Sequence, residues 1–205
     1  MNKLLRVLVV FSIFGGVLQI IATFGFGYQY QMGHDTMMVG VTVGLINFCS
    51  LILILLGLVA IFLYSYQVKA SKNLLISFIA VFIGTFFEAG AVWVITFVSP
   101  MLKVHAADLA QTWPTPTGEG MGFSLILFVI AWIYFGISSA VNKVLPITAS
   151  ILIPLSLILD FAPFGFISYF GSIFWAIAII WLSLAVYKRT KPEVLKEDTT
   201  TTVGT

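Results

Sequence analysis

The chain has 205 residues, of which 60% are hydrophobic and only 9% are charged, and its formal net charge is +2. Soluble globular domains carry about 25% charged residues, so this composition excludes an ordinary soluble protein. It predicts a chain that is solvated mainly by lipid. The small net charge gives no reason to expect a nucleic-acid partner.

Six apolar segments follow one another along the chain, and each is expected to form a membrane-crossing helix. Such a helix needs roughly 20 apolar residues to cross a hydrocarbon layer of about 30 Å. The segments cover residues 4–27, 38–64, 74–101, 122–142, 145–161 and 167–187. The fifth is the shortest, and Pro154 within it is expected to kink the helix. The pattern predicts an all-α, six-helix transmembrane domain over residues 1–191 and a disordered tail over residues 192–205.

The positions of the basic residues predict how this domain is oriented. Nine of the ten Lys and Arg residues lie at segment ends that would face one side of the membrane, and Lys103 is the exception. The nine are Lys3, Arg6, Lys69, Lys72, Lys143, Lys188, Arg189, Lys191 and Lys196. Because basic loops stay in the cytoplasm during insertion, we expect both termini to be cytoplasmic and the protein to reside in the plasma (cytoplasmic) membrane.

Glu88 is the strongest candidate for a functional residue within the segments. It lies near the centre of the third segment, where a charged side chain costs about 2.5–3.5 kcal/mol to insert and is seldom placed without a partner or a purpose. Its helix face also carries Ala80 and Gly84, as is typical of a face that packs against another helix. We therefore expect Glu88 to point into the protein and to bind a proton or a counter-charge. A neutral Glu88 that only forms a hydrogen bond is the alternative.

Three further polar residues are expected to share a pocket with Glu88. Gln19 in the first segment and Asn47 in the second lie in the outer half of the membrane on faces with small residues, and Asp160 lies at the outer end of the fifth segment. We predict a ligand- or proton-binding pocket, open to the outside, lined by Gln19, Asn47, Glu88 and Asp160. Gln and Asn in spans often serve only to hydrogen-bond neighbouring helices, and Asp160 could instead lie in water or cap a turn.

Glycines in two segments predict close contacts between helices. Gly40 and Gly44 form a GxxxG pattern in the second segment, and Gly84 lies one turn from Glu88 in the third. Glycine at such positions lets two backbones approach closely. We therefore expect Gly40, Gly44 and Gly84 to serve helix packing.

A second group of residues lies at the predicted outer boundary and could bind a metal. Methionine thioethers select soft ions such as Cu(I), and imidazole also suits copper. The candidate copper ligands are Met32, His34, Met37, Met38 and His105. The alternative is that methionine fills gaps at helix ends and that the histidines are ordinary loop residues.

Motifs for catalysis are absent from the sequence, which contains no H-E-x-x-H, G-x-S-x-G, Walker A lysine or C-x-x-C pattern. We therefore predict no catalytic residue and do not expect an enzyme. Three functions remain. The chain could transport a small solute or ion, or bind a substrate as a membrane subunit. It could be a non-catalytic accessory subunit that packs against other membrane subunits, or a copper-binding or redox-linked membrane protein.

Overall fold

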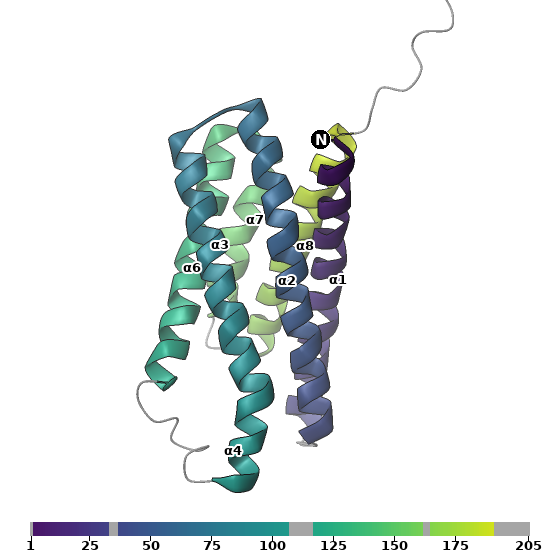
Figure 1. Cartoon of the computed structure of the whole chain (residues 1–205), viewed down its shortest axis with the longest axis vertical. Helices are drawn as coiled ribbons and strands as arrows, with labels where there is room; N and C mark the ends of the chain where they lie inside the picture. The colour runs from purple at the N-terminus through teal and green to yellow at the C-terminus, as the bar shows by residue number, and fades with distance from the viewer. Residues whose placement is uncertain (1, 33–36, 107–116, 162–164, 191–205) are drawn as a thin grey trace, which may run out of the picture.

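The structure is a computed structural model that describes residues 2–32, 37–106, 117–161 and 165–190. All regular secondary structure in these ranges is helical (Figure 1), which confirms the predicted all-α class. The elements are α1 (Asn2–Met32), α2 (Met37–Val68), α3 (Lys72–Trp93), the π-helix η1 (Val94–Val98), α4 (Ser99–His105), α6 (Thr117–Asn142), α7 (Ile147–Asp160) and α8 (Gly165–Arg189). The predicted tail, 192–205, lies outside the described residues.

Five of the helical segments are long and apolar enough to cross a membrane. They are α1, α2, the continuous segment from α3 into α4, α6 and α8. The remaining helix, α7, is apolar but has only 14 residues. At 1.5 Å per residue it is about 21 Å long, which is less than the thickness of a typical hydrocarbon layer. The chain is therefore an integral membrane protein with several spanning helices.

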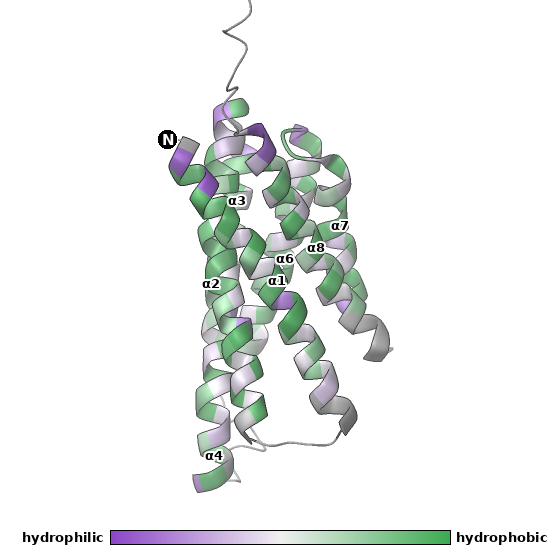
Figure 2. Ribbon diagram, turned by 90° about the vertical axis from the view of Figure 1, so that its right-hand side faces the viewer, coloured by the Kyte–Doolittle hydropathy of each residue, from purple (hydrophilic) through white to green (hydrophobic). Residues whose placement is uncertain are grey.

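The outer surface of the bundle has the character expected of a lipid-facing surface. Phe14, Phe86 and Ile130 point outward with 60%, 63% and 61% of their surface exposed. Figure 2 shows that hydrophobic residues dominate most of the length of the helices, while strongly hydrophilic ones gather mainly at the end that holds the N-terminus. In water such a surface would be an aggregation hazard, whereas lipid solvates it.

The helices form a closed ring. Each packs mainly against two neighbours: α1 on α2, α2 on α3, α3 on α6, α6 on α7 and α7 on α8, and contacts between α8 and α1 close the ring. A smaller contact joins α2 and α8. Neighbours in the chain are thus neighbours in space, as short connections favour. The α1–α8 contact joins the first and last helices. The interior of the ring is the only place in this arrangement where side chains from all the helices can meet.

Both ends of the described chain lie at the same end of the bundle as the α2–α3 connection (Figure 1). This end, which we call the basic end, carries Lys3, Arg6, Lys69, Lys72, Lys143, Lys188 and Arg189. Two of these side chains also hold the helix ends together. Arg189 Nη1 donates a hydrogen bond of 2.7 Å to the carbonyl of Val144, and the guanidinium of Arg6 lies 4.7 Å from the centre of the Tyr187 ring. The α4 end of the bundle lies opposite.

The third helix widens into a π-helix in its second half. Pro100 is the second residue of α4, which follows η1 directly. A proline inside a helix has no N–H to donate and its ring collides with the carbonyl four residues earlier, which here is that of Thr96. The wider π turn relieves this conflict without ending the helix. The segment predicted as one regular helix over residues 74–101 is therefore continuous but changes its register at Val94.

Candidate functional site

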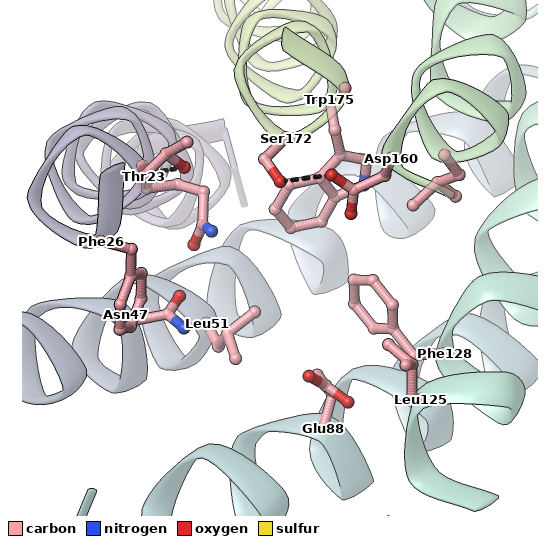
Figure 3. A pocket seen from close by; sticks show the side chains of 13 residues that line it. Thr23, Phe26, Asn47, Leu51, Glu88, Leu125, Phe128, Asp160, Ser172 and Trp175 are labelled. Atoms are coloured by element: carbon pink, nitrogen blue, oxygen red, sulfur yellow. Dashed lines mark hydrogen bonds between the residues drawn. The ribbon is translucent and has the colours of Figure 1, made fainter. Parts of the chain in front are cut away.

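A cavity of about 250 Å³ lies inside the ring, and all of the helices that form the ring contribute to its wall. Figure 3 shows side chains from several of them directed toward one open space. The lining residues are Gln19, Thr23, Phe26, Asn47, Leu51, Glu88, Leu125, Phe128, Leu157, Asp160, Gly171, Ser172 and Trp175. The structure thus brings the four residues of the predicted pocket, Gln19, Asn47, Glu88 and Asp160, to one cavity. Ligand or proton binding by them stays a prediction.

Glu88 is the acidic residue that α3 contributes to the wall. One of its carboxyl oxygens, Oε2, is enclosed by the protein and has no hydrogen-bond partner in the described part of the chain. In Figure 3 the carboxyl group points toward the open middle of the site. Buried polar atoms are nearly always paired. The unpaired Oε2 is therefore unusual, and it belongs to a residue that lines the cavity.

Asn47 and Gln19 lie on the neighbouring helices α2 and α1 but have different surroundings. Gln19 is bound to α2, because Ser50 Oγ lies 2.9 Å from Gln19 Oε1 and 2.8 Å from the carbonyl of Gly15. The single hydroxyl hydrogen of Ser50 can go to either acceptor. The side-chain oxygen of Asn47 is enclosed and has no such partner among the described residues. Gln19 therefore links two helices, whereas Asn47 leaves an acceptor free at the cavity.

Asp160 lies on the opposite wall, at the end of α7. It accepts a hydrogen bond of 2.8 Å from the hydroxyl of Ser172 on α8. Gly171 makes this contact feasible, because a Cβ on that residue would lie only 2.7 Å from the carbonyl oxygen of Ser156 on α7. Without a side chain at Gly171 the two helices approach closely, and Asp160 is held by a neighbour and does not extend freely into water.

Aromatic side chains separate the cavity from the basic end. Phe128 and Trp175 line the cavity, and Trp132 lies one turn farther along α6 toward the basic end. The rings of Trp132 and Trp175 meet edge to face with centroids 5.1 Å apart. Trp132 is completely buried and its Nε1 donates a hydrogen bond of 3.0 Å to Thr85 on α3. This packed layer closes the cavity on that side.

A second cavity of about 420 Å³ adjoins the first. The two share Phe26, Asn47 and Glu88, so that Glu88 lies at their junction. The remaining wall of the second cavity is mostly apolar. It comes from α2, α3, η1 and α4, and its residues are Gly40, Gly44, Val92, Ile95, Thr96, Ser99, Pro100 and Val104. The π-helix thus shapes this cavity directly.

The predicted packing glycines lie at two kinds of contact. Gly84 allows α3 and α6 to touch, because a Cβ there would lie 3.1 Å from both the Cβ of Ala131 and the Cα of Phe128. Gly44 packs against Thr96 of η1, whose hydroxyl a Cβ would overlap. Gly40 lines the second cavity. The GxxxG face of α2 therefore contacts the π-helix at Gly44, and it also forms part of the wall of the second cavity.

The predicted copper ligands fall largely where the structure gives no side-chain description. His34 lies outside the described residues, and Met32, Met37 and Met38 are described only as parts of the helix ends of α1 and α2. His105 is exposed at the end of α4. In the described ranges no three His, Cys, Asp or Glu side chains come together as a metal site would require. Copper binding by the methionines stays a prediction.

Several lining residues escaped the sequence analysis. Ser50 lies one turn from Asn47 on the same face of α2, so its position relative to Gln19 could have been read from helical spacing. Ser172 and Trp175 lie one turn apart at the start of α8. Nothing in their local sequence separates them from the other small and aromatic residues of that helix. Ser172 and Trp175 line the cavity because α8 packs against α7 and α1, and this packing cannot be read from the sequence of α8.

Comparison of the chain with family models, with curated proteins and with solved structures gives no match. The function is therefore argued from the geometry of the cavities alone. The wall offers hydrogen-bond acceptors, two carboxyl groups and aromatic faces. Together these groups give the described part of the wall both polar and apolar surfaces for contact with a ligand.

Proposed function

We propose that this chain crosses the membrane six times with both termini in the cytoplasm and binds a small solute or ion in an outward-facing pocket centred on Glu88. It acts either as a transporter of that solute or as the substrate-binding subunit of a transport system. The proposal rests mainly on one observation. Glu88 and Asn47 line a cavity that is walled by the whole ring of helices, and each carries an enclosed acceptor atom with no partner among the described residues.

The contrast with neighbouring polar residues supports a binding role. A polar residue that serves only the fold is expected to be paired with an adjacent helix. Gln19 meets that expectation through Ser50, and Asp160 does so through Ser172. Asn47 Oδ1 and Glu88 Oε2 do not. Other buried polar atoms of the described residues are also unpaired, but apart from the indole N–H of Trp175 they belong to residues that line neither cavity. An acid inside a membrane protein is expected to have a function unless a partner explains it.

The position of the cavity along the bundle supports its outward direction. Basic residues mark the cytoplasmic side of membrane proteins, and seven of them lie at the basic end of this bundle. The cavity lies beyond the Trp132 layer, in the half of the ring away from that end. A solute could therefore enter from outside and would be stopped by the aromatic layer.

The route of the chain supports a sixth crossing by α7. α6 runs toward the basic end, and α8 also ends there (Figure 1), so the chain must return through the bundle between them. α7 makes that return while packed against both. A short span can be accommodated by local thinning of the bilayer. In this arrangement Asp160 lies near the outer surface and at the mouth of the pocket.

In a transport cycle Glu88 would supply a charge that can be neutralised. A bound cation or a bound proton would each neutralise the carboxylate, and the two would compete for it. Release of the proton from Glu88 would then favour binding of the cation, and release of the cation would favour binding of a proton. Movement of the aromatic layer would be needed to open the pocket toward the cytoplasm.

Native mass spectrometry of the protein, extracted gently from its own membrane, tests this function. We expect a discrete small mass on the wild-type chain that is lost in Glu88→Gln and kept in Glu119→Gln. Glu119 is a matched control, because it is exposed in the first turn of α6 and lines neither cavity. A folded chain with no bound molecule contradicts the proposal. So does recovery only together with other polypeptides and without a bound small molecule, which favours an accessory subunit.

A further inference from the structure

The charges around the two cavities limit the kind of ligand that can bind. Glu88 and Asp160 are the charged residues in the walls, and none of the described residues that line either cavity is Lys, Arg or His. An anionic ligand would meet two carboxyl groups and no compensating charge, which is an effective way to reject it. A cation would be attracted, and the enclosed surroundings would strengthen the attraction relative to water.

The unpaired atoms add a requirement for hydrogen-bond donors. Asn47 Oδ1 and Glu88 Oε2 are both acceptors, and both residues lie where the two cavities meet. An ammonium group carries several N–H donors and satisfies such acceptors with short, charge-assisted bonds. An inorganic ion would instead need a shell of several oxygen ligands. The junction therefore matches a protonated amine well.

Aromatic faces next to these acceptors fit the same kind of group. Phe26 lines both cavities, and Phe128 and Trp175 line the first. Aromatic rings attract ammonium groups through their electron-rich faces. Trp175 is only 3% exposed, and its indole N–H has no acceptor among the described residues. This N–H is a donor that an ammonium group cannot satisfy, so it is the ring face of Trp175, and not its N–H, that supports a cationic ligand.

The second cavity determines what else the ligand must carry. Ligand pockets for drug-sized molecules have volumes of about 300–1,000 Å³. The first cavity, at about 250 Å³, falls below this range, while the second has about 420 Å³ and begins at Glu88. Its wall includes Val92, Ile95 and Val104. A ligand whose charged end lies at Glu88 would place an apolar body against these side chains.

We propose that the site binds a small organic cation, a protonated amine with an apolar body, whose ammonium group lies between Glu88 and Asn47 and whose body lies in the second cavity. This inference rests on the proposed binding function and assigns the chemical class of its ligand. The apolar body gains from burial against α3 and η1. The amine supplies the specificity.

Binding of a matched set of probes to the full chain in lipid nanodiscs tests the inference. Phenethylamine, phenylethanol and phenylacetate have similar shapes and are cationic, neutral and anionic at neutral pH. We expect phenethylamine to bind at least about tenfold more tightly than phenylethanol, and phenylacetate not to bind. Ethylamine, which lacks the ring, is expected to bind much more weakly than phenethylamine.

Variants assign the binding to the two cavities. Glu88→Gln should weaken phenethylamine binding about tenfold or more, Glu88→Asp should weaken it less, and Glu119→Gln should leave it unchanged. Ile95 lines the second cavity but is 50% exposed, so Ile95→Trp adds bulk at the cavity wall, and we expect it to weaken binding severalfold. Its control is Ile126→Trp on α6, since Ile126 is 60% exposed and lines neither cavity. If Glu88→Gln does not fold, the binding of phenethylamine to Glu88→Asp and to Ile95→Trp still tests whether the amine occupies the two cavities.

Two outcomes of the binding measurements would overturn the inference. One is phenylethanol or phenylacetate binding as tightly as phenethylamine. The other is a sodium-specific rise in melting temperature that Glu88→Gln abolishes, without any binding of the amine, because this assigns the site to an inorganic cation. A neutral or acidic molecule retained in native mass spectrometry and lost in Glu88→Gln would reject the amine class while supporting the binding function. If no molecule is retained and no probe binds, both the proposed binding function and the assignment of an amine ligand are wrong.

Discussion

Ser172 on α8 donates a hydrogen bond of 2.8 Å to Asp160 at the end of α7. This bond joins the shortest helix of the ring to the last one, at the wall of the polar cavity. It also orients one of the two carboxyl groups on which the proposed cation site depends. The strength of this contact can be measured separately from ligand binding.

Ser172→Ala should lower the free energy of unfolding by about 1 kcal/mol, because the variant removes the donor to Asp160. Reversible unfolding in mixed micelles, followed by tryptophan fluorescence, measures this change. A double-mutant cycle with Asp160→Asn isolates the contribution of the pair. Additive effects of the two substitutions would show that the bond contributes nothing to stability.

Gly84→Leu should destabilise the protein by about 1–3 kcal/mol or prevent its folding, because the new side chain would enter the contact between α3 and α6. The matched control is Gly90→Leu in the same helix, since nothing lies within 4 Å of a Cβ at Gly90. Melting temperature and the size-exclusion profile in detergent measure both variants. Equal losses in the two variants would mean that helix propensity or lipid contact, and not packing on α6, is responsible.

Thr85→Val should lower the free energy of unfolding by about 1–3 kcal/mol, because it leaves the fully buried Nε1 of Trp132 without its acceptor. Thr85→Ser keeps a hydroxyl and serves as the control. We also expect the emission of the buried tryptophans to change in Thr85→Val. If Thr85→Val is as stable as the wild type, the hydrogen bond does not hold the aromatic layer in place.

The sequence was sufficient to predict the helical class and the approximate helix positions, because apolar length dominates the behaviour of a membrane protein. It also predicted that Gln19 and Asn47 lie in the outer half of the membrane and Glu88 near its centre, since depth along a helix follows from counting residues. The cavity required more information. Depth does not say which helices are neighbours, and the contact between α8 and α1 that closes the ring has no signal in either helix alone.

The features that were missed have two different physical causes. Ser172 and Trp175 line the cavity because of tertiary contacts, which local sequence does not determine. The π-helix is different, since a proline at position 100 conflicts with the carbonyl of Thr96 in a regular α-helix, and this could have been read from the sequence. What could not be derived was the response of the helix, which could have kinked or ended there and instead widened between Val94 and Val98.

Orientation in the membrane is predicted from the basic end, and cysteine labelling tests it. Cys49→Ser removes the single native thiol, after which Lys69→Cys and Glu119→Cys each introduce one exposed thiol, at the basic end and at the first turn of α6. In intact cells a membrane-impermeant maleimide should label Glu119→Cys and not Lys69→Cys, because basic connections stay in the cytoplasm.

Permeabilised cells provide the control for this labelling. Both thiols should react there, which shows that each is accessible once the reagent can reach it. The reverse pattern in intact cells would place the basic end outside. The cavity of Glu88 would then face the cytoplasm, and a solute bound in it would have to come from inside the cell. Since the cavity lies beyond the Trp132 layer from the basic end, this single experiment determines on which side the proposed cation is captured.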